Sequence, residues 1–116
     1  MFDDPDFLYK LFKDLGAHAP IYINAMTDPG NPETYVVIEP VQDVPTVNGD
    51  GKVLLRTIEF NVRIHTSKAN DGVVLAKLYE AILDANDMTY NRYGPTIDPF
   101  SKRFSILIMG EYYYGK

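Results

Sequence analysis

One long segment of alternating polar and apolar side chains, Lys52–Thr66, constrains the fold of this chain more than any other feature. From Ile58 onward the even-numbered side chains are apolar and the odd-numbered ones are polar. The apolar set is Ile58, Phe60, Val62 and Ile64, and the polar set is Glu59, Asn61, Arg63 and His65. A period of two is typical of a strand with one buried and one solvated face. We therefore predict a half-buried sheet built around this strand.

The C-terminal segment, residues 102–114, repeats the alternation less strictly. One face carries Phe104, Ile106, Ile108 and Tyr112, and the other carries Arg103, Ser105 and Glu111 together with Leu107, Met109 and Tyr113. If Leu107, Met109 and Tyr113 are exposed, they form an apolar patch of the kind that marks an interaction site. The segment therefore predicts a second long strand and indicates self-association.

Two further segments have the spacing of amphipathic helices. The first opens at Asp4-Pro5-Asp6, where aspartate can cap and proline suits the first turn, and we expect Gly16 to end it. The second covers residues 71–84, after several capping side chains in residues 67–71. The apolar stripes are Phe7, Leu8, Leu11, Phe12 and Leu15 in the first, and Val74, Leu75, Leu78, Tyr79, Ile82 and Leu83 in the second.

Shorter strands are predicted at residues 20–24, 34–39 and 88–92. Residues 40–51, between the second of these and the long strand, contain two prolines and the turn-forming pairs Asn48-Gly49 and Asp50-Gly51. We expect a projecting loop there. Loops of this length are often functional, although a tolerated insertion without a role explains the segment equally well.

The expected order is helix, three strands, helix and two strands within one domain, residues 1–116. We predict an α+β fold, a two-layer sandwich with both helices on one face of a mostly antiparallel sheet of four to five strands. A chain of 116 residues can build such a core without staples, and this one has no cysteine.

Composition excludes several classes of function. The formal net charge is −5, so the chain as a whole repels a phosphate backbone. The N-terminus is acidic where a signal peptide is basic, and no apolar run approaches the length of a membrane span. Residues 102–107 lack the small residues of the RNA-recognition signature. We therefore expect a soluble, unexported protein that contacts no membrane.

No set of residues predicts catalysis. His18 and His65 are far apart in the sequence and have no partner at metal-ligand spacing. Two acidic pairs, Asp3 with Asp4 and Asp84 with Asp87, fit the ends of the two predicted helices. The glycines match neither of two phosphate-binding motifs, G-x-G-x-x-G and the loop that ends in G-K-[ST]. We predict no catalytic, cofactor-binding or metal-binding residues. A small α+β enzyme and a general bacterial interaction domain remain as alternatives.

Several stretches resemble the tail completion proteins of long-tailed bacteriophages and prophages, which are also called tail-to-head joining or tail terminator proteins. The likeness is one of pattern and placement, covers most of the chain and includes no invariant motif. It lies in residues 19–22 after a short helix, the long strand at 56–65, the helix at 71–84 and the aromatic last strand at 104–113. The same pattern fits another head-tail connector, an adaptor or a stopper.

The resemblance implies a non-enzymatic virion protein, made in the bacterial cytoplasm and located at the head-tail interface. Its partners would be further copies in a hexameric ring, the tail tube protein and the head connector proteins. A ring of identical subunits needs two complementary patches, and the face around Leu107 and Met109 is a candidate for one. Arg56 and Arg63 would line a lumen with loose DNA contacts, although a solvated sheet face also explains them. The candidate contact residues are Val47, Arg56, Arg63, Leu107, Met109 and Tyr113.

Overall fold

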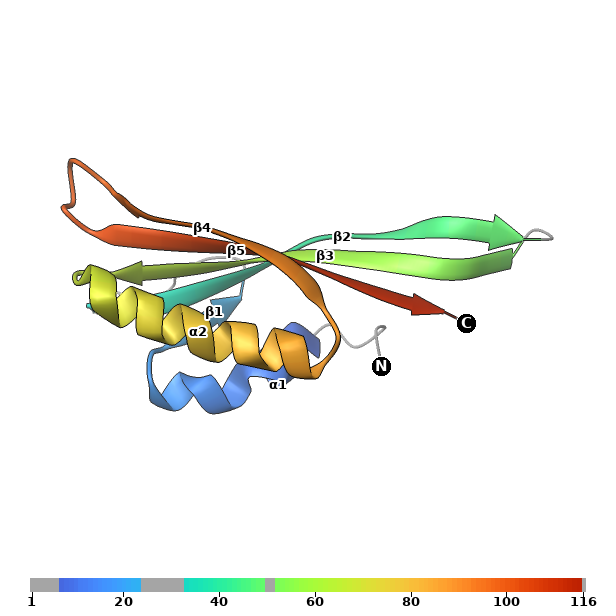
Figure 1. Cartoon of the computed structure of the whole chain (residues 1–116), viewed down its shortest axis with the longest axis horizontal. Coiled ribbons are helices and arrows are strands. Elements are labelled where there is room, and N and C mark those ends of the chain that lie inside the picture. The colour runs from blue at the N-terminus through green and yellow to red at the C-terminus, as the bar shows by residue number, and fades with distance from the viewer. Residues whose placement is uncertain (1–6, 24–32, 50–51, 116) are drawn as a thin grey trace.

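The computed structural model describes residues 7–23, 33–49 and 52–115, with side chains at 8–23, 33–41 and 57–112 (Figure 1). It confirms the α+β class and the predicted order of elements. These are α1 (Phe7–Phe12), the 3-10 helix η1 (Lys13–Ala17), β1 (Ile21–Ile23), β2 (Tyr35–Gly49), β3 (Lys52–Thr66), α2 (Ala69–Ala85), β4 (Thr89–Ile97) and β5 (Phe104–Gly115).

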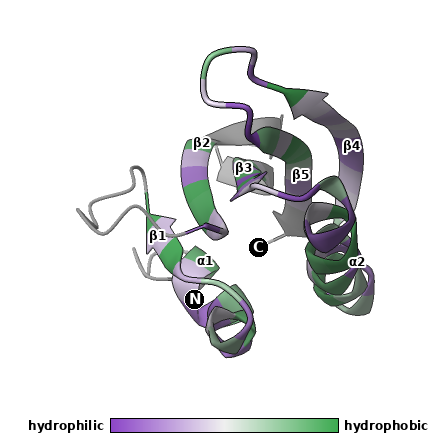
Figure 2. Ribbon diagram, turned by 90° about the vertical axis from the view of Figure 1, so that its left-hand side faces the viewer, coloured by the Kyte–Doolittle hydropathy of each residue, from purple (hydrophilic) through white to green (hydrophobic). Residues whose placement is uncertain are grey.

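The five strands form one sheet in the order β1-β2-β3-β5-β4. β1 runs parallel to β2, and every other neighbouring pair is antiparallel, so the sheet is mixed. β3, with the bounds that the alternation predicts, lies at the centre and pairs with β2 and β5 along most of its length. Both helices lie on the same face of this sheet, which Figure 2 shows end-on.

Residues 40–51, predicted as a loop, belong largely to the sheet, and that prediction was wrong. β2 continues to Gly49, which pairs with Lys52, while residues 50–51 lie outside the described part. Register shifts follow Pro40 and Pro45, because proline lacks the amide hydrogen that a regular ladder needs. The described part of β1 pairs with β2 from Val36 to Ile38 and no further. Both prolines therefore lie where β2 forms the edge of the sheet.

The paired residues 42–49 and 52–56 extend well past the helices, and we call them the arm (Figure 1). The molecule measures 53 × 26 × 24 Å, and the arm accounts for its long axis. β5 accompanies the arm as far as the pairing of Gly115 with Leu55. The arm is therefore a three-stranded extension at its base.

Element ends differ from the sequence predictions at three places. The start predicted at residues 4–6 lies outside the described part, and Gly16 falls inside η1 instead of ending the helix. α2 begins at Ala69, where the backbone N–H of Lys68 donates to the Thr66 hydroxyl at 3.2 Å. β4 continues past Arg92 to Ile97 through a register shift. Gly94 lies in that shift with a φ of +100°, and the peptide bond between Gly94 and Pro95 is cis.

The core lies between the sheet and the two helices. The rings of Phe12 and Tyr79 lie 4.9 Å apart, and those of Phe12 and Phe60 lie 6.3 Å apart. Burial of apolar area of this kind supplies most of the favourable free energy of folding. The described core is Leu8, Phe12, Leu15, Ala19, Val36, Ile38, Ile58, Phe60, Val62, Ile64, Leu75, Ala76, Tyr79, Leu83, Met88, Ile106 and Ile108.

The Phe60 ring lies directly on Gly110, its cross-strand partner in β5. A Cβ at residue 110 would lie 2.6 Å from this ring, which is only 1% exposed. We predict that Gly110→Ala lowers the free energy of unfolding by about 2 kcal/mol, because a packed core resists an added methyl group. Denaturant melts measure the change. In a Phe60→Leu background the same substitution should cost less; an equal cost in both backgrounds would contradict the contact.

The hydroxyl of Tyr79 is buried and has no hydrogen-bond partner among the described residues. Burial also raises the pKa of this phenol. We predict that Tyr79→Phe raises the free energy of unfolding by about 1 kcal/mol, because it removes a desolvated polar group and keeps the ring. Tyr79→Leu, which loses the contact with Phe12, should lower it. A Phe variant less stable than the natural protein would show that the hydroxyl is satisfied.

Candidate interaction surface

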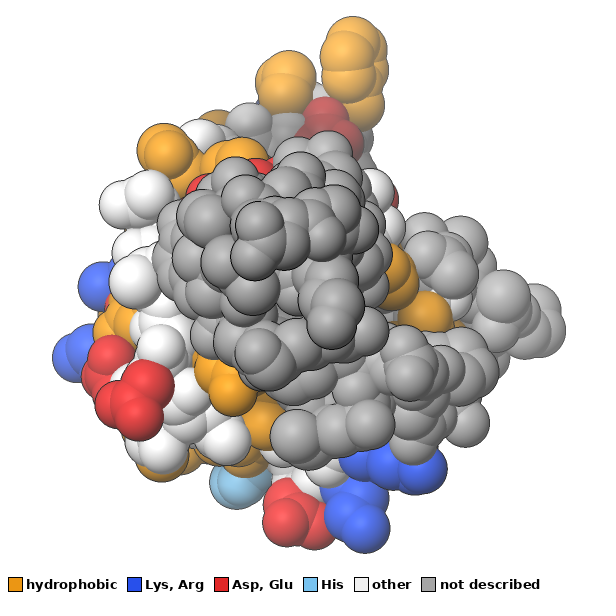
Figure 3. Space-filling view, turned by 90° about the vertical axis from the view of Figure 1, so that its right-hand side faces the viewer, with side chains coloured by type: hydrophobic (Ala, Val, Ile, Leu, Met, Phe, Trp, Pro, Cys, Tyr) orange, Lys and Arg blue, Asp and Glu red, His pale blue; other side chains and the backbone are white. Residues whose placement is uncertain are grey.

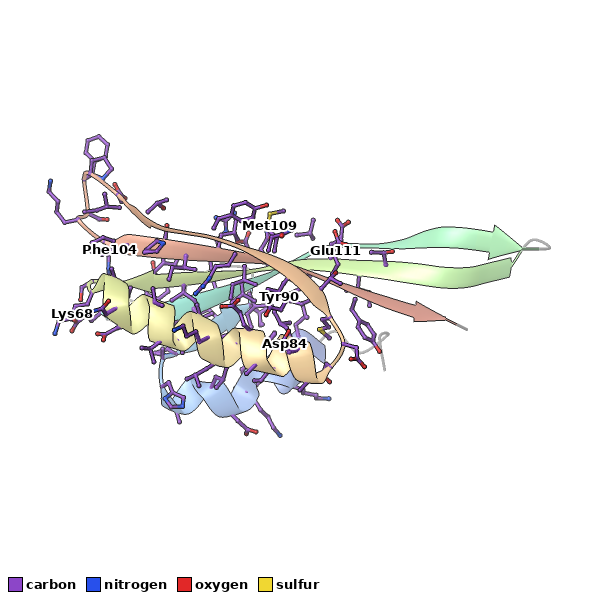
Figure 4. All side chains as sticks on the ribbon, in the orientation of Figure 1. Lys68, Asp84, Tyr90, Phe104, Met109 and Glu111 are labelled. Atoms are coloured by element: carbon purple, nitrogen blue, oxygen red, sulfur yellow. The ribbon has the colours of Figure 1, made fainter. Side chains whose placement is uncertain are left out.

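The sheet face opposite the helices is the candidate interaction surface, and we call it the open face. Figure 4 shows Met109 and Glu111 on the open face, whereas Tyr90 and Asp84 lie toward α2. The strand register arranges its side chains in rows across the strands. Successive rows are Tyr35, His65, Ser105 and Thr96; Val37, Arg63, Leu107 and Tyr93; Glu39, Asn61, Met109 and Asn91; and Glu59, Glu111 and Thr89.

Apolar side chains lie exposed across the middle of the open face. Met109 is 46% exposed, Tyr93 is 52% exposed and Val41 is 53% exposed, while Leu107 is half-buried. Met109 borders two shallow hollows, one of about 260 Å³ beside Tyr93 and one of about 190 Å³ beside Val41. We call Val41, Tyr93, Leu107 and Met109 the apolar strip. Contiguous apolar surface of this kind is typical of a contact with another protein.

An ion pair crosses the open face next to the apolar strip. The guanidinium Nε of Arg63 contacts Oε1 of Glu39, and the two residues lie on neighbouring strands, β3 and β2. Both side chains are well exposed, so the pair adds little to stability. Its effect is local, since the charge of Arg63 is offset within its own chain.

Aromatic and charged side chains gather at the end of the open face nearest the start of α2. The rings of Tyr35 and His65 stack with centroids 4.7 Å apart, and the Arg103 guanidinium carbon lies 5.6 Å from the Tyr35 centroid. A hollow of about 380 Å³ opens beside them. It is lined by Tyr35, His65, Asp98, Ser101, Arg103, Phe104 and Ser105.

His65 is held toward its neutral form at this place. Burial lowers its pKa below the ordinary value near 6.5, and the positive charges of Arg63 and Arg103 lower it further, while Glu39 acts in the opposite direction. The hollow beside His65 has one carboxylate in its lining, Asp98. The enzyme alternative would be favoured by a histidine that meets two carboxylates in a cleft. The lining of this hollow does not contain that set of residues.

The structure brings three of the six predicted contact residues together. Arg63, Leu107 and Met109 occupy adjacent rows of the open face. The other three residues lie in or beside the arm, with Val47 paired to Leu55, Arg56 paired to Tyr114, and Tyr113 paired to Thr57. The side chains of those three fall outside the described part of the chain.

Sequence reasoning missed several residues of the open face. Val41 falls in the segment that was predicted to be a loop, and Tyr93 lies just past the strand predicted at residues 88–92, so their apolar side chains were not assigned to a sheet face. The alternation around Val41 is broken by the register shift after Pro40. For Tyr93 the local pattern offers no signal, because Tyr90 and Tyr93 are three residues apart and a period of two places them on opposite faces of a strand.

Among the described residues, no group of three or more His, Asp or Glu side chains is placed to hold a metal ion. Within the same part of the chain, neither helix has the length and apolar character needed to cross a membrane.

Comparison of the sequence with protein-family models and with curated proteins finds no match.

The lowered pKa of His65 predicts a specific dependence of stability on pH. Because the unfolded chain protonates this histidine more readily than the folded one, the cost is absent well above pH 6.5 and grows as the pH falls through it. We expect His65→Gln to lose less stability than the natural protein between about pH 7.5 and about pH 5.5. Thermal melts at each pH measure this, with exposed His18→Gln as control; an unchanged pH dependence in His65→Gln would contradict the assignment.

Proposed function

We propose that this chain is a structural protein of a bacteriophage virion at the head-tail junction, a tail completion or terminator subunit. In this proposal, copies form a ring that caps the tail tube and docks to the head connector. The sequence resemblance gives the class, and two structural features support it. These are the open face with its apolar strip and the arm.

The open face is the observation that carries the proposal. Two helices cover one face of the sheet, and the described residues place no layer on the other, where Met109, Tyr93 and Val41 are about half exposed. A two-layer domain buries its apolar surface against another layer, and here a neighbouring copy would supply it. A contact between the open face of one copy and a different surface of the next is heterologous, and such contacts form a ring when the rotation between copies closes.

The arm supports a role in which the subunit reaches along an assembly. It lies past the ends of α1 and α2, and it runs along the 53 Å axis of the molecule (Figure 1). Copies arranged with parallel long axes would direct all of their arms toward the same end of a ring. The arm is then suited to contact the tail tube or the connector.

The charges of this chain give little electrostatic support for contact with DNA in the lumen. Arg63 is paired with Glu39, and the net charge of the chain is −5. Contacts to a phosphate backbone depend on unneutralised basic side chains. We therefore expect only loose, sequence-independent contact. An adaptor or stopper would use the same open face and arm, and it remains the alternative assignment.

Co-sedimentation with purified tail tubes of the phage or prophage that encodes this chain tests the proposal. We expect the chain to pellet with the tubes and to appear as a ring at the tube end in negative-stain micrographs. Met109→Asp should abolish this, because it places a charge in the centre of the apolar strip.

Tyr9→Asp is the matched control, since Tyr9 is 44% exposed and lies on α1 away from the open face. It should pellet like the natural chain. A natural chain that stays in the supernatant in the presence of tubes would reject the tail role. Equal binding by Met109→Asp would reject the role of the apolar strip.

A further inference from the structure

The most exposed large apolar side chain of the described residues is Phe100, at 94%. It lies in the connection between β4 and β5, outside the apolar strip, and next to it Ile97 is 54% exposed. Figure 3 shows hydrophobic side chains standing out at the top of the molecule, on the side of the open face. A phenylalanine displayed in this way contributes no packing to its own subunit, so its position calls for a partner.

The connection that displays Phe100 is held by its own hydrogen bonds. The backbone N–H of Asp98 donates to the Arg103 carbonyl, and that of Lys102 donates to the Asp98 carbonyl, both at 2.8 Å. The Phe100 N–H donates to the Asp98 carboxylate at 2.9 Å. This bond is the largest cause of the lowered pKa of Asp98. Residues 98–103 are therefore a preorganised turn, and ordering Phe100 for binding costs little conformational entropy.

A hollow of suitable chemistry lies on the helical side of the molecule. It has a volume of about 250 Å³ and is lined by His18, Thr34, Asp71, Val74, Leu75 and Leu78. Val74 is 62% exposed although it is apolar, and it faces outward from α2. Three apolar side chains of α2 thus line a concave site with an acidic residue, Asp71, among its walls.

The turn and the hollow carry charges of opposite sign. Lys102 lies two residues from Phe100 and is exposed, and Asp71 is exposed in the lining of the hollow. A phenylalanine seated against Val74 would bring the ammonium group and the carboxylate within reach of each other. Aromatic anchors in apolar pockets with a charged rim are typical of the strongest contacts in protein interfaces.

The two features lie at one end of the long axis but on opposite sides of the sheet. The β4–β5 connection lies near the start of α2 along that axis in Figure 1, and it lies away from the helices in Figure 2. One subunit therefore cannot fill its own hollow with its own turn by a small movement. A second copy, placed side by side with its long axis parallel, presents the hollow to the turn.

We propose that Phe100 of one copy inserts into the hollow at Val74 of the next copy, with Lys102 facing Asp71 across the rim. The contact is heterologous, because it joins two different surfaces. It rests on the proposed ring function and deepens it by naming the anchor and its site. It also places the start of α2 of one copy next to the β4–β5 connection of its neighbour.

Because the chain has no cysteine, single introduced thiols can test this contact on the purified protein. A Lys102→Cys chain is mixed with an Asp71→Cys chain in a glutathione redox buffer, and the mixed disulfide dimer is measured over time. Both substitutions keep Phe100 and Val74. The matched control replaces Asp71→Cys by Ala85→Cys, an exposed residue at the other end of α2 and about 21 Å away along the helix.

We expect the pair at residues 102 and 71 to form disulfide at least about tenfold faster than the pair at 102 and 85, since a disulfide requires closely spaced Cα atoms. Adding Phe100→Ser to the Lys102→Cys chain should remove this advantage. That variant should melt at the same temperature as its parent, because Phe100 is almost fully exposed.

Equal rates for the two pairs, whether fast or slow, would overturn the proposed contact, and so would an advantage that survives Phe100→Ser. This experiment contains no tail tubes, so its outcome is separate from the test of the proposed function. A fast disulfide without tube binding keeps the contact and rejects the tail role. Tube binding without the fast disulfide rejects the contact alone.

Discussion

The rest of the structure depends on β3, which pairs on both sides while its two faces differ in polarity. Its even-numbered side chains Phe60, Val62 and Ile64 are buried under the helices, and its odd-numbered side chains face away from them. A shift of one residue in the register would exchange these faces, so the register with β2 and β5 is strongly fixed. The positions of Arg63, Leu107 and Met109 in adjacent rows follow directly from that register.

The same strand explains the shape of the molecule. The helical layer covers only one side and one end of the sheet, and β2 and β3 continue past it as the arm. The open face has no covering layer among the described residues, and the backbone of the arm extends past the helices. The proposed role in a repeating assembly would account for both, because in such an assembly neighbouring copies would supply the missing layer.

The sequence predicts the class, the element order and the bounds of β3 because these depend on local periodicity. It fails at residues 40–49, since two prolines and an Asn-Gly pair are typical of loops, and only the partner strand β3 turns this segment into a ladder with register shifts. It fails again after Arg92, where Gly94-Pro95 reads as an end but lies within β4. Exposure is also hard to predict, because the half-burial of Leu107 depends on its neighbours across the strands.

The candidate surface was predictable only in part. The alternation of β5 is enough to place Leu107 and Met109 on one face, whereas Val41 and Tyr93 join them through strand pairing that local pattern does not contain. The hollow at Val74 depends on residues from η1 to α2 that are distant in sequence, His18, Thr34 and Leu78 among them. Sites of this kind are a property of packing, and the sequence gives only their chemistry.

The central claim is that the open face lacks cover in the single subunit and gains it on assembly. Hydroxyl-radical footprinting of two of the four methionines tests it, because Met109 is 46% exposed on the open face and Met88 is 5% exposed in the core. The account predicts that Met109 is oxidised much faster than Met88 in the free chain and is protected in the assembled ring. Equal, slow oxidation of both methionines in the free chain would contradict it.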